Sequence, residues 1–432
     1  MYYFIGIKGT GMSSLAVILK QLGNDVSGSD VDKHFFTESG LIKNNIPFYV
    51  YNADNIKEGY RIIKGASIKD DNEELIKAKK LGLKIYEYNE MVGLLTEEFE
   101  TICVAGCHGK TTTTSMLALA LRNRGVNYLI GDGTGSALKD NKYFALESCE
   151  YKRHFLAYSP TYAIITNIDL DHVDYFKDIN DVIDAYTSYA NKASKVVIAY
   201  GDDPYTRQMK LKKDVVFYGL KENNDIRATN IKYTSEGVSF DVNGYGHFEL
   251  PLYGEHQLLD ALAVITLCYL ERIDYKEVYN NLKEFTGAKR RFSLTEIKDD
   301  IVIDDYAHHP NEVKATIDSI KQKYPGKKIV AIFQPHTFTR TKMFAKDLIE
   351  VFKTVDKAYL LDIHPARESQ DDYPEVTSNM IIDVLDNAEH INIDESDKLK
   401  DYDNTVFAFM SPNDLSKLEN DLIEKLKTRK NS

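Results

Sequence analysis

The chain has 432 residues, more than a single hydrophobic core usually organises, so we expect two or three domains. Hydrophobic residues make up 43% of the sequence and charged residues 28%, proportions that are typical of a soluble globular protein. The net charge of −12 argues against a nucleic-acid-binding or membrane-surface protein, because both partners require a positive field.

Sequence patterns also argue against membrane insertion and secretion. No apolar run approaches the length of a membrane span, and the first residues lack the basic, apolar and cleavage segments of a signal peptide. The four cysteines form neither a C-x-x-C pair nor a disulfide-like framework. We therefore expect a cytoplasmic protein with reduced thiols.

Residues 1–95 predict a Rossmann-like domain. Residues 2–7 have the apolar pattern of a buried strand, a glycine turn and a helical pattern follow, and residues 25–30 predict a second strand that ends at Asp30. The glycines are spaced G-x-x-G-x-G rather than G-x-G-x-x-G, so the turn alone fits an ordinary tight turn equally well. Asp30 at the end of a strand favours a contact with a ribose or a uridine.

Residues 96–293 predict a domain with a P-loop ATPase-like parallel sheet. A buried strand over 101–105 leads into a polar loop over 106–110 and then into an apolar helix that we expect to end at Gly125. Residues 226–252 alternate between apolar and polar with period two and contain glycines, which predicts a small antiparallel insert.

Residues 294–432 predict a second Rossmann-like domain. Short apolar runs that do not alternate are each followed by a polar loop, as in "IVIDDYA" before "HHPNE" and "KIVAIFQ" before "PHTFTRT". Right-handed crossovers bring such loops to the carboxyl edge of one parallel sheet, where α/β proteins bind ligands. The predicted fold class is therefore α/β with three domains.

The stretch "CVAGCHGKTTTT" (103–114) resembles a phosphate-binding loop, although Val104 stands where the pattern G-x-x-x-x-G-K-[ST] has its first glycine. Its position between a strand and a helix N-terminus favours an anion, because backbone N–H groups and the helix dipole point there. Lys110 supplies a positive charge, and the Thr111 hydroxyl could bind Mg²⁺. The candidate nucleotide-binding residues here are Gly106, Cys107, His108, Gly109, Lys110, Thr111 and Thr112.

Two further residues follow predicted strands of the same domain. Glu147 and His172 could complete or orient a cation site near Thr111. Their spacing allows equally that Glu147 is a solvated acid and that His172 caps a helix. The basic triplet Lys289–Arg291 could reach phosphate oxygens across a cleft, although most such triplets are solvated surface.

The predicted strand-end loops of residues 294–432 are rich in histidine and arginine. Cations gathered at one sheet edge predict a site for an anionic substrate or a carboxylate, and their spacing does not match a zinc site. The residues are His308, His309, Arg340, His364 and Arg367.

Taken together, the motifs resemble those of the ATP-dependent Mur ligases of peptidoglycan synthesis. The landmarks are "GIKGTGMSSLA", "GSD", "GCHGKTTTT", "TNIDLDH", "YGEHQLLDALA", "GAKRRF", "DDYAHHPNE" and "FQPHTFTRT". In that family the phosphate loop is G-[TA]-x-G-K-[ST] with no distant first glycine, so Val104 is expected.

The resemblance implies a chemistry and a set of substrates. ATP, with Mg²⁺, would phosphorylate the carboxyl group of UDP-N-acetylmuramate, and the amine of L-alanine would attack the acyl phosphate to form an amide. Lys110 would hold the β- and γ-phosphates, Thr111, Glu147 and His172 would serve Mg²⁺, and Gly9, Thr10, Gly11 and Asp30 would face the uridine nucleotide. Arg291 would contact the γ-phosphate or the carboxylate, Asp305 the nucleotide, and His309 and Arg340 the amino acid.

Several positions depart from the family pattern and leave alternatives open. Cys107 replaces a Thr or Ala, Gln257 and Asp260 stand where Asn is common, Thr337 stands where many relatives have Arg, and residues 411–414 replace a Gly-rich loop. Thr337 in particular keeps open a related ligase that uses another amino acid or a recycled peptide. A regulatory P-loop GTPase is a further alternative, but "NKAS" has Ser194 where the base-reading motif requires Asp.

Overall fold

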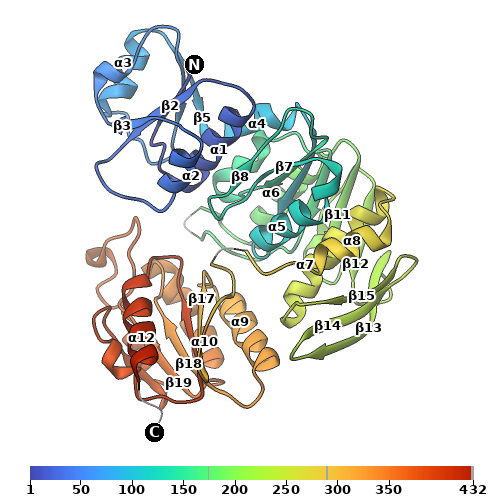
Figure 1. Ribbon diagram of the computed structural model, residues 1–432, viewed down its shortest axis with the longest axis vertical. Helices are drawn as coiled ribbons and strands as arrows, with labels where there is room; N and C mark the ends of the chain where they lie inside the picture. The colour runs from blue at the N-terminus through green and yellow to red at the C-terminus, as the bar shows by residue number, and fades with distance from the viewer. Residues whose placement is uncertain (174, 289, 430–432) are drawn as a thin grey trace. The chain divides into compact units, whose positions relative to one another are not determined.

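The computed structural model describes residues 1–173, 175–288 and 290–429 (Figure 1). The chain forms two compact units. The first comprises residues 1–229, 242–246 and 259–285, and the second comprises residues 230–241, 247–258 and 286–432. The described residues form three sheets, and the predicted α/β fold class is confirmed. The predicted domain boundaries near residues 95 and 293 stay a prediction.

The first sheet has five parallel strands in the order β3-β2-β1-β4-β5. Its strands are β1 (Tyr2–Ile5), β2 (Val26–Asp30), β3 (Phe48–Val50), β4 (Arg61–Lys64) and β5 (Lys84–Glu87). Its helices are α1 (Thr10–Gln21), α2 (Glu38–Lys43), α3 (Glu73–Lys80) and α4 (Tyr88–Thr96), with a 3₁₀ turn at Ala53–Asn55. The strand predicted over 2–7 ends early because Gly6 turns the chain with φ +86°.

The second sheet has ten strands in the order β15-β14-β13-β12-β11-β10-β6-β9-β7-β8. Its strands are β6 (Glu100–Ala105), β7 (Val126–Leu129), β8 (Gly135–Ser136), β9 (Tyr143–Glu147), β10 (Tyr162–Ile165), β11 (Val196–Tyr200), β12 (Val215–Gly219), β13 (Ile226–Thr234), β14 (Gly237–Val242) and β15 (Gly246–Leu250). The short connections between β13, β14 and β15 can join only antiparallel strands, as predicted for the insert.

The helices of this central region are α5 (Lys110–Ala120), α6 (Ile179–Ala190), α7 (Gly254–Leu270) and α8 (Tyr275–Leu282), with 3₁₀ segments at Arg122–Arg124, Tyr151–Ala157 and Thr206–Gln208. The helix predicted to run to Gly125 ends sooner, at Ala120. Its last turns tighten into the first of these 3₁₀ segments, and Gly125 then reverses the chain with φ +72°.

The third sheet has six strands in the order β16-β17-β21-β18-β19-β20, parallel except for the antiparallel edge strand β16. Its strands are β16 (Ser293–Ile297), β17 (Asp300–Asp305), β18 (Lys328–Phe333), β19 (Lys357–Leu360), β20 (Ala388–His390) and β21 (Thr405–Met410). Its helices are α9 (Pro310–Lys323), α10 (Phe338–Phe352), α11 (Asn379–Ile382) and α12 (Ser416–Thr428), with 3₁₀ turns at Gln370–Asp372 and Ser396–Lys398.

Apolar residues on both faces of each sheet explain why these strands do not alternate with polar residues. Along β17, Ile301 and Ile303 pack into the core shared with α9 and α10, whereas Val302 packs into the core shared with α12. Covered faces leave only the strand ends and their loops for ligand binding.

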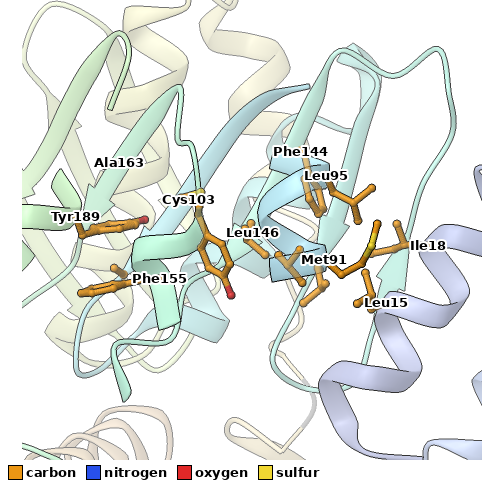
Figure 2. Close-up of a cluster of buried hydrophobic side chains, with 14 of the residues drawn as sticks. Leu15, Ile18, Met91, Leu95, Cys103, Phe144, Leu146, Phe155, Ala163 and Tyr189 are labelled. Carbon is orange, nitrogen blue, oxygen red and sulfur yellow. The ribbon is translucent and has the colours of Figure 1, made fainter. Parts of the chain in front are cut away.

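One hydrophobic core joins the first sheet's helices to the central sheet. Figure 2 shows Met91 and Leu95 of α4 beside Leu15 and Ile18 of α1, with Phe144 of β9 close by. Burial of large apolar side chains is the main stabilising contribution in such a core. Among the described residues, no helix combines the length and the apolar character that crossing a membrane requires.

A buried carboxylate anchors the other face of the first sheet and generates a stability prediction. Glu74 is fully buried and accepts hydrogen bonds from Tyr3 Oη at 3.0 Å, Asn52 N at 3.1 Å and Asn55 Nδ2 at 2.8 Å.

Substitution Glu74→Ala leaves these donors without an acceptor, and we expect the free energy of unfolding to fall by about 2–4 kcal/mol. Urea denaturation of the two proteins measures this free energy of unfolding. The exposed neighbour Glu73→Ala is the control, and equal losses for the two variants would contradict this account.

Candidate active site

The loop between β6 and α5 has the backbone geometry of a phosphate-binding loop. Gly109 adopts φ +82° and precedes α5 without a side-chain cap, so the first N–H groups of the helix are not covered by a capping side chain. A Cβ atom on Gly109 would lie 2.3 Å from Asp260 Oδ1, and one on Gly106 would lie 1.8 Å from Thr166 Oγ1. Val104 lies inside β6, paired with Ile164 and Glu147. The loop therefore begins after Val104.

The segment after β10 fixes the shape of this loop. Asn167 Oδ1 accepts a hydrogen bond from His108 N at 2.9 Å, and Asn167 Nδ2 donates one to His108 O at 2.9 Å. Thr166 Oγ1 donates to the same carbonyl at 2.6 Å. These bonds tie the loop to the segment that follows β10.

The Cys107 side chain contacts the segment that follows β10 and a tyrosine of α6. Its thiol donates to Asp169 O at 3.0 Å and accepts from Asp169 N at 3.1 Å, and it lies 3.8 Å from Tyr186 Oη. Burial raises the pKa of the Cys107 thiol well above its ordinary value. A thiol that stays protonated is a poor nucleophile, so Cys107 has a structural contact here rather than a reactive one.

Lys110 is the first residue of α5, and its side chain folds back over the loop. Its Nζ atom donates to Gly106 O, to Cys107 O at 3.2 Å and to Glu150 Oε1 at 3.2 Å. Burial alone would lower the pKa of Lys110, but the Glu150 carboxylate outweighs that effect and raises the pKa. Lys110 therefore remains an ammonium group.

Of the two acids that follow β9, Glu150 is the one in contact with Lys110. Glu147 ends β9 and accepts a hydrogen bond from Gly131 N at 2.8 Å, in the glycine-rich loop 131–135. His172 lies 3.5 Å from Glu150, measured from Nε2 to Oε1. The structure thus brings Lys110, Glu150 and His172 together. Sequence reasoning missed Glu150, for which the acidic segment after a strand was the only available signal.

Threonine residues follow Lys110 at the start of α5. Thr111 is buried in the first turn, Thr112 is half-buried, and Thr113 Oγ1 donates to Asp260 Oδ1 at 3.1 Å. Asp260 therefore supports the loop through the helix. Gln257 accepts a hydrogen bond from Tyr253 N at 3.0 Å.

In the first sheet, the predicted nucleotide turn lies between β1 and α1. Gly9 precedes α1, Thr10 begins it, and a Cβ atom on Gly11 would lie 2.8 Å from the Tyr88 ring. Asp30 is buried and accepts hydrogen bonds from Lys8 N at 2.7 Å and Val31 N at 2.8 Å. The structure therefore puts Asp30 beside the glycine turn, where its carboxylate holds the backbone.

In the second unit, Arg290 and Arg291 have different surroundings, and Lys289 lies outside the described residues. Arg290 pairs with Asp304 at 3.1 Å and donates to Ser411 O and Asn413 O, both at 2.8 Å. It therefore holds the loop that replaces a Gly-rich one. Arg291 lies over the Tyr306 ring at 5.0 Å and 3.5 Å from Glu312.

Asp305, at the end of β17, is buried beneath the same segment. It accepts hydrogen bonds from Phe292 N at 2.9 Å and Ala307 N at 2.8 Å. Burial raises the pKa of Asp305 to about 6, and the nearby Arg291 guanidinium opposes that shift. Asp305 thus fixes the backbone that carries Arg291.

A group of histidines and arginines gathers at the carboxyl edge of the third sheet, and it includes His336, which sequence reasoning had not selected. The His336 ring stacks on His364 at 5.6 Å and lies 5.9 Å from His308. Burial lowers the pKa of His336 to about 3, helped by His308, Arg340, His364 and Arg367. The neutral ring accepts a hydrogen bond from Arg340 Nη1 at 3.1 Å.

The adjacent histidines 308 and 309 face different surroundings. His309 is only 3% exposed, caps α9 by accepting from Asn311 N, and packs at 4.6 Å from the Phe344 ring. His308 is the one that lies beside His336. Arg340 lies in the first turn of α10, where Glu368 accepts from Phe338 N at 2.6 Å and Thr339 N at 3.1 Å. The candidate anion-binding edge of the third sheet is therefore formed by His308, His336, His364 and Arg340.

Three family models match consecutive parts of the chain. The model described as Mur ligase family, catalytic domain, matches residues 1–100, the Mur ligase middle domain matches residues 104–268, and the model described as Mur ligase, glutamate ligase domain, matches residues 290–408.

Solved structures agree with these matches. UDP-N-acetylmuramate–alanine ligase from Thermotoga maritima is 26% identical over 99% of both chains, with a TM-score of 0.82. A murein peptide ligase from Psychrobacter arcticus is 20% identical, covers 100% of this chain and 99% of its own, and has a TM-score of 0.73. MurF ligase from Thermotoga maritima, solved with ADP, is 16% identical over 96% of this chain and 99% of its own, with a TM-score of 0.63. The murein peptide ligase and MurF ligase share the fold of this chain.

The family resemblance inferred from the motifs is confirmed, because the three models follow one another along almost the whole chain and a solved relative matches it from end to end. The chain therefore belongs to the Mur ligase family, the ATP-dependent ligases of peptidoglycan precursor synthesis.

Proposed function

We propose that this enzyme joins L-alanine to the carboxyl group of UDP-N-acetylmuramate, with ATP split to ADP and phosphate. The observation that carries the proposal is the end-to-end match to the UDP-N-acetylmuramate–alanine ligase of Thermotoga maritima, at 26% identity and a TM-score of 0.82. The nucleotide-linked substrate and ATP make this a cytoplasmic reaction of small molecules. We further propose that residues 1–95, 96–293 and 294–432 are its three domains.

The proposed reaction proceeds through an acyl phosphate. The substrate carboxylate attacks the γ-phosphorus of ATP, ADP leaves, and the alanine amine then displaces phosphate from the acyl carbon to form the amide. Several anions must approach one another, so fixed donors are needed. The glycine-lined loop 106–109 offers backbone N–H groups, and Lys110 offers an ammonium group for the β- and γ-phosphates.

We propose that Mg²⁺ binds near the start of α5 through Thr111, Glu147 and His172. The hydroxyl and the carboxylate are the hard oxygen ligands that Mg²⁺ prefers, and the ion keeps several waters in such sites. When bound, the ion would neutralise phosphate charge during transfer. The chain's own residues would orient the triphosphate.

The other substrates would bind at strand ends. We assign the uridine nucleotide to the turn at Gly9, Thr10 and Gly11, with Asp30 holding that turn from behind. Asp305 would position Arg291 towards the γ-phosphate or the carboxylate.

We assign the carboxylate of the incoming amino acid to the group of histidines and arginines at the carboxyl edge of the third sheet. Arg340 supplies a permanent charge, and the neutral His336 orients its guanidinium. The buried position of His309 favours a role in shaping α9, and His308 is better directed for a substrate contact.

The first prediction concerns the amino acid, because Thr337 stands where many relatives have Arg. We expect phosphate release with UDP-N-acetylmuramate to be fastest with L-alanine and at least about tenfold slower with glycine or serine, since a lost or added group in a small pocket changes binding by ~1–3 kcal/mol. A tripeptide is offered to the enzyme in the same assay. Release with the tripeptide and none with alanine would support a peptide ligase instead.

A second prediction concerns the phosphate loop. Substitution Lys110→Ala removes the ammonium group, and we expect turnover to fall on the order of 10²–10³-fold or more while the fold persists. Circular dichroism and thermal unfolding check the fold. Full turnover by the folded variant would refute the phosphate role.

The third prediction concerns Mg²⁺. Substitutions Glu147→Ala and His172→Ala should each raise the Mg²⁺ concentration required for half-maximal turnover by about tenfold or more, because each removes a metal ligand or its support. Substitution Glu97→Ala, at an exposed position just after α4, serves as the control. Wild-type Mg²⁺ curves for both variants would remove these residues from the cation site.

A further inference from the structure

Glu150 is a buried acid to which the proposed reaction assigns no role. The residue is 1% exposed and lies in the segment between β9 and the 3₁₀ segment Tyr151–Ala157. Oε1 and Oε2 lie 3.2 and 3.1 Å from Lys110 Nζ, and Oε1 lies 3.5 Å from His172 Nε2. One carboxylate therefore contacts two functional side chains that are 62 residues apart in the sequence.

This burial is costly unless the charge is compensated. An isolated carboxylate loses its hydration when buried, and paired cations are what make such a position tenable. Lys110 Nζ lies within 3.2 Å of both Glu150 carboxylate oxygens and supplies the compensating charge. The carboxylate is thus paired with the loop lysine.

Lys110 and His172 are also held by further contacts of their own. Lys110 Nζ donates to the loop carbonyls of Gly106 and Cys107. His172 has a left-handed backbone with φ +51°, its N–H donates to Asp171 Oδ1 at 2.7 Å, and its ring lies 4.9 Å from Tyr151. Backbone strain of this kind persists only where surrounding contacts maintain it. Glu150 is the contact that links His172 to Lys110.

We propose that Glu150 is a positioning residue that anchors Lys110 and His172 to each other, so that both keep their places when the triphosphate enters the loop. The two loop carbonyls give up their bonds to Lys110 Nζ in favour of phosphate oxygens, and Glu150 retains one N–H of the same ammonium group. The proposal rests on the phosphate role of Lys110 proposed above.

This arrangement has a distinctive kinetic consequence. The Glu150 charge lies close to where anionic phosphates bind, so it does not favour nucleotide binding itself. Its benefit is geometric and is realised during phosphoryl transfer, when small displacements of a catalytic group are costly. Loss of the carboxylate should therefore lower kcat without weakening the binding of ATP.

The test compares nucleotide binding with turnover in Glu150→Gln, which keeps the shape and removes the charge. Calorimetry with the non-hydrolysable analogue AMP-PNP and Mg²⁺ gives Kd, and phosphate release with UDP-N-acetylmuramate and L-alanine gives kcat. We expect Kd to stay within about threefold of the wild-type value or to tighten, a change below ~0.7 kcal/mol. We expect kcat to fall on the order of 10–100-fold. A kcat within about threefold of wild type, or a Kd raised as much as in Lys110→Ala, would overturn the proposal.

Matched variants separate positioning from general destabilisation. Glu271→Gln alters another ion-paired carboxylate of the same unit, at the end of α7, and should lower the melting temperature while leaving kcat unchanged. A parallel loss of kcat there would assign the Glu150 effect to stability and overturn the proposal. Glu150→Asp keeps the charge and should recover part of kcat. If Glu150→Gln fails to fold, Glu150→Asp must show a lowered kcat without a weakened Kd, at smaller amplitude. Wild-type kinetics of Glu150→Asp would then overturn the proposal.

The Lys110→Ala variant distinguishes the two levels of failure. If it binds AMP-PNP and turns over like the wild type, the proposed phosphate role fails, and the role of Glu150 fails with it. If Lys110→Ala is impaired while Glu150→Gln behaves as wild type, only the inference about Glu150 fails. AMP-PNP binding needs no amino acid, so an error in the assigned acceptor does not affect this comparison.

Discussion

The positive charge of Lys110 is the constraint on which the phosphate loop depends. An ammonium group at the start of a helix lies at the positive end of the helix dipole, and in a buried site it has little water to screen it. Glu150 supplies the compensating charge, and loop carbonyls accept the remaining N–H groups. A triphosphate satisfies the same requirement with its own negative charge. In the phosphate site that we propose, the lysine is thus held by the protein's own groups.

Much of this loop could be predicted from the sequence because its geometry is local. Glycines at 106 and 109 adopt backbone angles and close contacts that exclude a side chain, and the strand before them and the helix after them are encoded by apolar patterns. Val104 is also explained locally, since it belongs to the strand rather than to the turn. Short-range rules were sufficient for these residues.

The contact between Lys110 and Glu150 could not be predicted in this way. Glu147 and Glu150 are three residues apart and follow the same strand, and no local pattern tells which of them faces the lysine. The structure decides it through the turn that follows, where Lys152 and Arg153 are both left-handed and Phe155 stacks on Tyr189 at 4.4 Å. The same applies to the neighbours His308 and His309, of which the second is turned inward as the cap of α9. Side-chain direction at an element's end depends on tertiary packing, which a single sequence does not display.

In the third sheet, two positions that depart from the family pattern are held by backbone hydrogen bonds. Thr337, a β-branched residue with φ +64°, is held in this unfavourable conformation by its place before α10 and by Thr337 N donating to His364 O at 2.9 Å. Arg290 secures the loop 411–414 through its backbone carbonyls, an interaction that tolerates changes in the side chains of that loop. Both departures from the family pattern thus lie in strand-end loops whose backbones are held by hydrogen bonds to neighbouring segments. Arg340 and Arg367 bring their charges near the neutral His336, so the carboxylate site that we propose at this edge does not require an arginine at position 337.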